Sequence, residues 1–312
     1  MPGDKVTRIA VLGSLMQDLV VRAPRLPVVG ETLFGQSFQL FPGGKGGNQA
    51  IAAARMGAGP VTMIGAVGDD AFAPAVLDAL GDAGVDLTHV RRDVPQGTGV
   101  AIPIVFDDGT NSIISIPRAN LAISREHVAA CASVIESSDL LLLQFEVAME
   151  ANRTATAIAT SAGVPVLLNA APVATPPPGL LDSVSILVVN ELEADALTGR
   201  PGSRQQQAHA LRERGPTTVV ITLGAAGSVV SSVSFVGAVP AFRVEAVDSV
   251  GAGDAFCGAL AVALAEERDL QECLLLASAA GAIAVTRHGA APSLPFRQEV
   301  EELVSKGTFT SP

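Results

Sequence analysis

The chain has very little aromatic side-chain area. It contains no tryptophan and no tyrosine, and aromatic residues make up 4% of its 312 residues. A site that stacks a flat base needs such side chains, so a nucleoside-binding function is disfavoured. Charged residues make up only 16%, whereas hydrophobic residues make up 48%. This composition argues against disorder and predicts a large core of Ala, Val, Leu and Ile, as in buried parallel strands covered by helices.

The few basic residues and the scattered cysteines restrict the partners and the compartment. The formal net charge is −11, so nucleic acid and anionic membranes are disfavoured as partners. Cys131, Cys257 and Cys273 form no CxxC pair, which argues against a zinc site or a disulfide framework and for a reducing compartment. No export signal is visible at the start, and the longest apolar run, 274–285, is too short to span a bilayer. We therefore expect a cytoplasmic protein in which this run forms a buried helix.

Most of the chain alternates between apolar strands and amphipathic or Ala-rich helices. Strands are expected at 6–13, 61–65, 139–144, 164–169, 185–189 and 217–222, with a hairpin near 227–239. Helices are expected at 48–56, 71–83, 124–137, 148–162, 191–198, 203–214, 253–266, 270–286 and 296–306. This alternation predicts an α/β fold with a mostly parallel sheet that helices cover on both faces.

Two segments interrupt this alternation with strands that have one polar face. Residues 15–41 hold the first pair, of which 15–22 continues directly from the first strand. Residues 98–106 and 111–117 flank Asp108-Gly109, a dipeptide typical of tight turns, so they are expected to form a hairpin. We expect these strands to pair as a separate small sheet that serves as a lid or a dimer surface.

The strongest signal for chemistry is the segment DSVGAGDAF at residues 248–256. Gly251, Ala252 and Gly253 lead into a helix that begins near Asp254. A helix N-terminus with so little side-chain cover can hold a phosphoryl group through backbone N–H groups. We expect the pKa of Asp254 to be lowered there, and the carboxylate to suit a base that accepts the proton of an attacking hydroxyl. The alternative is an ordinary Asp N-cap after a flexible turn.

A second signal is the glycine-rich segment GGKGGNQA at residues 43–50. Four glycines within five residues allow the backbone to approach a ligand closely. Asn48, at the expected start of a helix, offers both a donor and an acceptor. The alternative is a glycine-rich connection that Asn48 caps.

Two weaker signals follow strands, at the edge of the sheet where α/β proteins bind ligands. Asn190 and Glu193 come after strand 185–189, and Glu193 could hold a water bound to Mg²⁺. The alternative is ordinary acidic residues at the start of a helix, which the helix macrodipole favours. The segment 222–227, with sequence TLGAAG, is a candidate nucleotide-contacting turn, and its alternative is a simple hairpin entry.

In this order and spacing, the four segments resemble the ribokinase-like (PfkB) carbohydrate kinase family. The resemblance runs from Val6 to Leu303, and GGKGGNQA and DSVGAGDAFCGA correspond to the two signatures of the family. Within the family the chain looks most like the ribokinase branch. That closer similarity rests on segments 11–14, 30–32, 144–146, 197–199, 285–287 and 292–293.

The resemblance implies a fold, a division of the chain and an activity. The fold is a three-layer α/β/α sandwich with a mostly parallel central sheet and a small β-sheet lid, through which a homodimer forms. The kinase domain would comprise residues 1–14, 43–96 and 121–312, and the lid 15–42 and 97–120. The activity is ATP-dependent phosphorylation of a primary hydroxyl of a small sugar, with Mg²⁺ as cofactor and K⁺ as an activating cation.

The resemblance also implies roles for single residues. Those implied in sugar binding are Asp18, Gly43, Gly44, Lys45, Asn48, Glu146 and Asp254. Those implied in binding ATP are Asn190, Glu193, Thr222, Gly224, Gly227, Gly253 and Ser278, with Asn190 and Glu193 reaching Mg²⁺ through water. Asp254 is the implied base, beside an anion hole of Gly251, Ala252 and Gly253. The implied K⁺ site uses Asp248, Ser293 and the backbone of Val250, Ala284, Arg287 and Gly289, and it orders the anion-hole loop.

One departure from the ribokinase pattern bears on the substrate. Met16 stands two residues before Asp18, where the pattern has an asparagine that can hydrogen-bond a sugar hydroxyl. An apolar surface leaves that hydroxyl without a partner and penalises sugars that carry it. Met16 therefore favours 2-deoxy-D-ribose, with D-ribose close behind, and resembles the deoxyribokinase branch. The alternative is that Met16 only packs.

Two smaller departures are Arg118-Ala119-Asn120, in place of Gly-Ala-Asn, and NAAP at 169–172, in place of Asn-Pro-Ala-Pro. Arg118 could stiffen the exit of the lid, reach a substrate oxygen or lie in solvent. The second departure is expected to have no chemical consequence.

Three other functions compete with a pentose kinase. A kinase of another sugar, such as a ketohexose, or of a nucleoside would share the signatures, although the scarcity of aromatic residues counts against a nucleoside. A non-catalytic sensor on the same fold would not need Asp254 and a complete anion-hole loop. A dinucleotide oxidoreductase would need a glycine-rich turn after the first strand, where the chain has Gly13-Ser14-Leu15-Met16.

Overall fold

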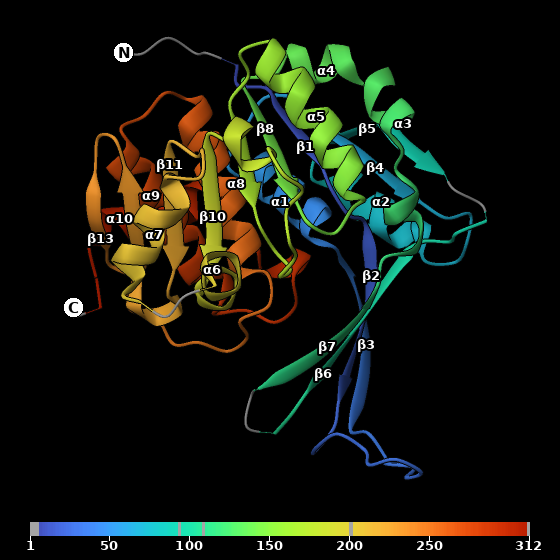
Figure 1. The fold of residues 1–312 in the computed structure, drawn as a ribbon. Helices are drawn as coiled ribbons and strands as arrows, with labels where there is room; N and C mark the ends of the chain where they lie inside the picture. Colours follow the sequence, from blue (N-terminus) through green and yellow to red (C-terminus); the bar gives the residue numbers. More distant parts are fainter. Residues whose placement is uncertain (1–5, 93–94, 108–109, 200–201, 311–312) are drawn as a thin grey trace.

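The computed structural model describes residues 6–92, 95–107, 110–199 and 202–310. Its main sheet has nine strands in the order β13-β12-β11-β10-β9-β8-β1-β4-β5 (Figure 1). These strands are β1 (Ile9–Leu12), β4 (Val61–Val67), β5 (Val85–Arg92), β8 (Leu140–Gln144), β9 (Val166–Asn169), β10 (Ile186–Asn190), β11 (Thr218–Thr222), β12 (Ser228–Ser232) and β13 (Val236–Val239). All neighbours from β11 to β5 pair in parallel, and the β12–β13 hairpin adds two antiparallel strands at one edge.

Helices cover both faces of this sheet, because successive side chains of its strands point to opposite faces. In β1, Ile9 and Val11 join one core cluster and Ala10 and Leu12 the other. The first cluster lies under α1 (Lys45–Arg55), α2 (Ala73–Asp82), α8 (Ala252–Ala265), α9 (Leu270–Ala284) and α10 (Arg297–Lys306). The second lies under α3 (Arg125–Ala130), α4 (Ala132–Glu136), α5 (Met149–Ser161), α6 (Glu191–Thr198) and α7 (Arg204–Arg212). The predicted three-layer α/β/α sandwich is confirmed.

The apolar run 274–285 lies almost entirely in α9, whose inner residues are buried. Across the described ranges, no helix combines the length and the apolar character that crossing a bilayer would require.

Four further strands form a separate small sheet that projects from the sandwich (Figure 1). They are β2 (Met16–Arg22), β3 (Ser37–Gly43), β6 (Gly99–Val105) and β7 (Asn111–Ile116), in the order β3-β2-β6-β7. β6 and β7 pair antiparallel, as the hairpin prediction requires, although its turn residues, Asp108 and Gly109, lie outside the described residues. The segment 15–22 therefore leaves the first strand and enters a different sheet. The division into kinase domain and lid stays a prediction.

Two elements differ from the sequence prediction. Strand β5 was not predicted, because it is an edge strand with polar side chains, and only its first residue, Val85, is fully buried. The single helix expected at 124–137 is two helices, α3 and α4, which meet at Cys131 with φ −96° and ψ 9°.

Two residues fasten the exit of the small sheet to the sandwich. The Asn120 amide Nδ2 donates to Leu15 O at 3.0 Å, and its Oδ1 accepts from Leu15 N at 2.8 Å. Arg118 adopts a left-handed φ of 48°, and its guanidinium donates to Gln96 O and Thr98 O, each at 2.9 Å. It also lies 3.5 Å from the Asp70 carboxylate. These contacts hold Arg118 against the segment that precedes β6, and its role in stiffening the exit of a lid stays a prediction.

Candidate active site

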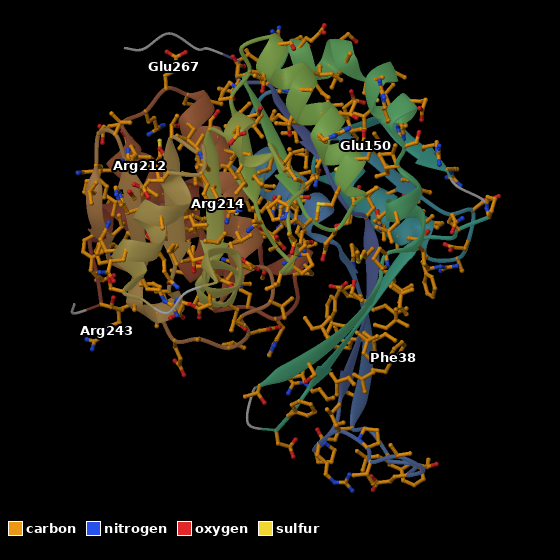
Figure 2. The ribbon with its side chains drawn as sticks, viewed as in Figure 1. Phe38, Glu150, Arg212, Arg214, Arg243 and Glu267 are labelled. Atoms are coloured by element: carbon orange, nitrogen blue, oxygen red, sulfur yellow. The ribbon has the colours of Figure 1, made fainter. Side chains whose placement is uncertain are left out.

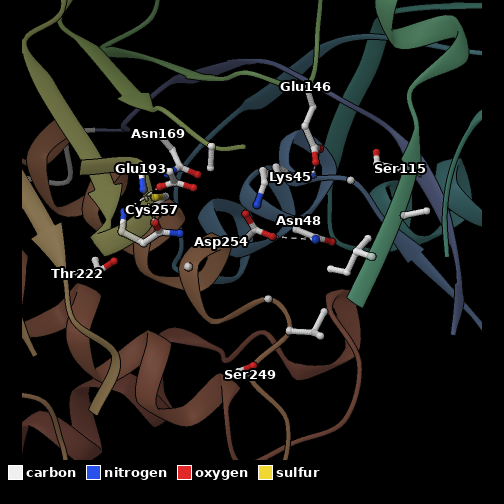
Figure 3. A pocket seen from close by; sticks show the side chains of 18 of the residues that line it. Lys45, Asn48, Ser115, Glu146, Asn169, Glu193, Thr222, Ser249, Asp254 and Cys257 are labelled. Atoms are coloured by element: carbon white, nitrogen blue, oxygen red, sulfur yellow. Dashed lines mark hydrogen bonds between the residues drawn. The ribbon is translucent and has the colours of Figure 1, made fainter. Parts of the chain in front are cut away.

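Most residues singled out in the sequence meet in one pocket between the main sheet and the small sheet (Figure 3). It is a cavity of about 460 Å³ at the carboxyl ends of the parallel strands, where α/β proteins bind ligands. The predicted residues that line it are Met16, Asp18, Gly44, Lys45, Asn48, Glu146, Asn190, Glu193, Thr222, Gly224, Val250, Gly251, Gly253 and Asp254.

Asp254 lies at the N-terminus of α8, as the third residue of the helix. Gly251 is the N-cap, with a left-handed φ of 82° that suits glycine. The first backbone N–H groups of a helix have no partner within it. Ala252 N donates to Ser249 O at the long distance of 3.4 Å, and no bond from Gly253 N or Asp254 N is found among the described residues, so these two can take an anion. Asp254 Oδ2 accepts from Asn48 Nδ2 at 2.9 Å, a bond drawn in Figure 3, and Oδ1 accepts from Gln49 Nε2 at 3.0 Å.

The pKa of Asp254 is raised above its ordinary value, whereas the sequence predicted a lowered pKa. Burial is the largest cause, because it disfavours the charged carboxylate. The Lys45 ammonium, which points toward Asp254 in Figure 3, and the two amide donors act in the opposite direction without offsetting burial. A raised pKa makes the ionised carboxylate a stronger proton acceptor than an exposed aspartate.

Helices α1 and α8, which carry these groups, are packed unusually closely. A side chain at Gly258 of α8 would place its Cβ 2.5 Å from Ala52 Cβ and 2.9 Å from Gln49 O on α1. Glycine at this position therefore allows the amide donors of α1 to reach the Asp254 carboxylate.

Helix α1 begins at Lys45, three residues earlier than its asparagine suggested. Its N-cap, Gly44, has φ 86°, which disfavours residues with a side chain, and a Cβ there would lie 2.8 Å from Met16 N. Both the backbone conformation and the lack of space therefore require glycine. Asn48 is buried inside the helix, and its Oδ1 has no hydrogen-bond partner among the described residues. This oxygen can accept a bond from a ligand hydroxyl at the pocket wall.

Two carboxylates lie at the end of the pocket near the small sheet. Glu146 is held by the Ser14 hydroxyl and by Lys45 N, which donates at 2.9 Å. Asp18 is buried, and no hydrogen bond to its carboxylate is found among the described residues. Burial, together with Glu146 and Asp254, raises the pKa of Asp18 to about 7. Gly43 does not line the pocket but makes room for Asp18, because a Cβ there would lie 2.4 Å from that carboxylate.

The pocket-facing side of the small sheet contributes residues that the sequence did not reveal. Asp18 pairs with Ala101, and Ala101 with Ser115, so the three side chains share one face. Ser115 Oγ lies 3.8 Å from the sulfur of Met16, which is buried at the pocket wall. Other lining residues not predicted are Pro103, Ile113, Asn169, Ala171, Val188, Glu191, Ser249 and Cys257.

A second cavity of about 570 Å³ adjoins the first near Gly253. Both cavities are lined by Thr222, Gly224, Ser249 and Gly253. The second also contains the remaining predicted ATP-binding residues, Gly227 and Ser278, together with Ala252 of the anion-hole loop. Its wall is largely apolar, with Phe242, Phe256 and Val285.

Asn190 and Glu193 form a capping box at the start of α6. Asn190 N donates to Glu193 Oε2 at 2.8 Å, and Asn190 Oδ1 accepts from Glu193 N at 2.9 Å. The pair therefore caps the helix, which was not predicted from the sequence, and one Glu193 oxygen remains for a ligand. Burial raises the pKa of Glu193.

Of the residues predicted to hold K⁺, only Val250 lines the first cavity, and none lines the second. Asp248 accepts from Val250 N and Gly289 N, each at 3.0 Å, which ties two of them together. A Cβ at Gly251 would lie 3.2 Å from Ser293 Oγ, so Ser293 is adjacent to the anion-hole loop. Ala284 O accepts from Arg287 N at 3.1 Å.

The comparisons with known proteins agree with this geometry. Residues 6–297 match the pfkB family carbohydrate kinases. A ribokinase of Haemophilus influenzae is 38% identical over 300 residues, which cover 95% of this chain and 98% of the relative. A deoxyribokinase of Salmonella typhi is 35% identical over 306 residues, with coverage of 95% and 98%. The structure of Arabidopsis thaliana ribokinase complexed with ribose and ATP has a TM-score of 0.86 and 34% identity, with coverage of 96% and 99%. The chain therefore belongs to the pfkB family of carbohydrate kinases and is, within that family, a kinase of the ribokinase type.

Proposed function

We propose that the protein transfers the γ-phosphoryl group of ATP to the 5-hydroxyl of a pentose, with 2-deoxy-D-ribose favoured and D-ribose close behind. The observation that carries this proposal is the position of Asp254 in the first cavity, directly after Gly253, which lines both that cavity and the second, largely apolar one. Four further carboxylates, Asp18, Glu146, Glu191 and Glu193, also line the first cavity. The first cavity suits a sugar, and the second suits the base and ribose of ATP. The Arabidopsis ribokinase structure, which contains ribose and ATP, is similar over almost the whole chain.

The geometry supports a direct transfer between the two cavities. Asp254 accepts the proton of the sugar hydroxyl while that oxygen forms a bond to the γ-phosphorus, and the bond from phosphorus to the leaving ADP oxygen breaks. The backbone N–H groups after Gly251 stabilise the charge on the transferring group. The small sheet, as a lid, excludes water from the pocket and so limits hydrolysis of ATP.

Two cations would assist this reaction. The second Glu193 oxygen and Asn190 would hold Mg²⁺ through water, because this ion keeps most of its waters, and when bound it would supply positive charge to offset that of the phosphates. Among the described residues, no group of three or more His, Cys, Asp and Glu side chains could hold a metal ion. Asp248, Ser293 and the backbone carbonyls of Val250, Ala284, Arg287 and Gly289 offer the oxygen donors that K⁺ takes. There K⁺ would order the anion-hole loop.

Met16 supports the preference for deoxyribose. Its buried side chain presents a thioether where a hydroxyl of ribose would need a strong hydrogen-bond partner. Leaving a hydroxyl unpaired costs about 1–3 kcal/mol, which corresponds to roughly 5- to 150-fold in selectivity.

We expect Met16→Asn to shift the ratio of kcat/KM for 2-deoxy-D-ribose over D-ribose toward ribose by about tenfold, because the amide can pair with the extra hydroxyl. The measurement is sugar-dependent ADP release with ATP, Mg²⁺ and K⁺. Met16→Leu is the matched control, since it keeps an apolar side chain of similar size. If the wild-type protein clearly prefers ribose, Met16 only packs; if neither pentose reacts, the pentose assignment is wrong and other sugars must be screened.

The outer face of the small sheet supports a homodimer. Phe38, Leu40, Ile114 and Ile116 lie on the face opposite to Asp18 and are between 44% and 58% exposed. Figure 2 shows Phe38 on the projecting sheet, away from the sandwich. Apolar side chains gathered on one exposed sheet face mark an association surface. A second copy of the chain can cover it with the same face.

We expect Phe38→Glu combined with Ile114→Glu to convert a dimer into a monomer, because two charges on each copy would be buried against their counterparts. Sedimentation velocity measures this change. Val233→Glu is the control: Val233 is apolar and even more exposed, but it lies in the turn between β12 and β13, so its substitution should leave the dimer intact. A wild-type protein that sediments as a monomer at all concentrations contradicts the proposal.

A further inference from the structure

The Asp254 carboxylate is held by a buried chain of amide side chains that the proposed mechanism has not used. Gln49 Nε2 donates to Asp254 Oδ1 at 3.0 Å and to Asn169 Oδ1 at 3.1 Å. Gln144 Nε2 donates to Gln49 Oε1 at 2.7 Å. Gln49 and Gln144 are both completely buried. The chain of bonds thus links the end of β8 through α1 to the N-terminus of α8.

The Asp254 carboxylate determines which group donates and which accepts in every bond of this chain. An ionised carboxylate only accepts hydrogen bonds, so Gln49 must present its NH₂ group to Asp254. Its oxygen then faces Gln144, which must donate. The remaining Gln144 oxygen lies against Gly13, where a Cβ would be 2.1 Å away, and it has no partner among the described residues. The backbone carbonyl of Gln144 accepts from Asn152 Nδ2 at 2.7 Å, which further fixes the strand end.

We propose that Gln49, oriented by Gln144, is a positioning residue that keeps Asp254 ionised and directs its free lone pairs toward the sugar hydroxyl. Because the Gln49 NH₂ group cannot accept a proton, the side of Oδ1 that faces Gln49 is closed to protonation. A proton taken from substrate must therefore stay on the pocket side, from which it can leave. This inference rests on the proposed role of Asp254 as the base.

The other charged and titratable groups around Asp254 do not supply this restraint. Lys45 on α1 attracts the ionised form, whereas Asp18 on β2 and Glu146 after β8 oppose it. The Cys257 thiol on α8 and Glu193 on α6 complete the surroundings, and burial keeps the pKa of Cys257 well above its usual value. Asn48 is the second donor and holds the other carboxylate oxygen. Gln49 is thus the side chain that donates to Oδ1. Its orientation is fixed by its bond from the buried Gln144.

The test is the pH dependence of kcat for sugar-dependent ADP release by the full chain, in the wild type and in Gln49→Met. Removing a donor to the carboxylate raises its pKa, and a base must be deprotonated to act, so the acidic limb should move to higher pH by roughly one unit. We expect kcat to fall by up to roughly tenfold on the acidic side of this limb, to recover at higher pH, and KM for both substrates to change less than twofold. Gln144→Met should shift the limb in the same direction by less.

Gln207→Met is the matched control, since Gln207 is also a buried helical glutamine but lies on α7, where it donates to Asp195 Oδ1 at 2.8 Å. It should lower the melting temperature without moving the acidic limb. A loss in Gln49→Met that is equal at every pH, or an unchanged profile, overturns the inference while leaving the kinase activity established. If Gln49→Met does not fold, an unshifted limb in Gln144→Met overturns it. A wild type without sugar-dependent ADP release overturns the proposed function together with this inference.

Discussion

Replacing Asp254 by Asn is expected to reduce kcat by at least ~100-fold, the loss typical of a positioned general base. The asparagine amide has nearly the same shape but cannot take the proton of the sugar hydroxyl. It also places an NH₂ group opposite the donors of Asn48 or Gln49, so one of these bonds is lost. Steady-state ADP release measures the loss, and isothermal titration calorimetry with the sugar tests whether binding persists.

The control for this substitution is Asp195→Asn on α6, which removes an exposed carboxylate paired with Arg204 and should leave kcat unchanged. Burial of the Asp254 charge disfavours the folded state, so the Asp254→Asn protein should remain folded. Near-normal turnover in Asp254→Asn would remove Asp254 from the role of base and leave the phosphate-binding loop to account for catalysis.

Asp18→Asn is expected to weaken sugar binding and to stabilise the protein at the same time. The buried carboxylate has no hydrogen bond among the described residues, which leaves its oxygens for sugar hydroxyls. Loss of a charged acceptor should raise KM for the sugar by roughly 10- to 100-fold. Asparagine removes a buried charge, so the melting temperature without sugar should rise by a few degrees at pH 8.

The gain in stability should depend on pH in a defined direction. The pKa of Asp18 is raised from 3.8 to about 7 in the folded state. Below pH 4 both the folded and the unfolded states carry the proton, and the wild type has no penalty. Between pH 4 and 7 the unfolded state loses the proton first, so wild-type stability falls, and above pH 7 the penalty is constant. The difference in melting temperature between Asp18→Asn and the wild type should grow from pH 4 to 7; a difference independent of pH contradicts this account.

The layered fold could be predicted because buried parallel strands are apolar on both faces, as in β8 and β10. Strand β5 escaped prediction because an edge strand needs only one apolar face. The glycine-rich segments were visible because close approach to a ligand and a left-handed φ leave little choice of residue, as at Gly44 and Gly251.

The supporting shell of the site could not be predicted in the same way. Gln49 directly follows Asn48, but its partners Gln144 and Asn169 lie 95 and 120 residues away in the chain. No local pattern signals a contact over such a separation. The direction of the pKa shift of Asp254 was mispredicted because the charge of a helix N-terminus can be read from sequence, whereas burial depends on the packing of distant elements.

The close approach of α1 and α8 at Gly258 sets the distance between the Asp254 carboxylate on α8 and its amide donors on α1. Gly258 is one turn beyond Asp254 and contacts Ala52 and the backbone of Gln49, not the pocket. A methyl group there would act as a wedge and separate the base from the amides that hold it. Under the proposed mechanism, a position that looks like ordinary core filling would therefore set the alignment of the base with the sugar hydroxyl, and substitutions at this helix crossing should change turnover more than substrate choice.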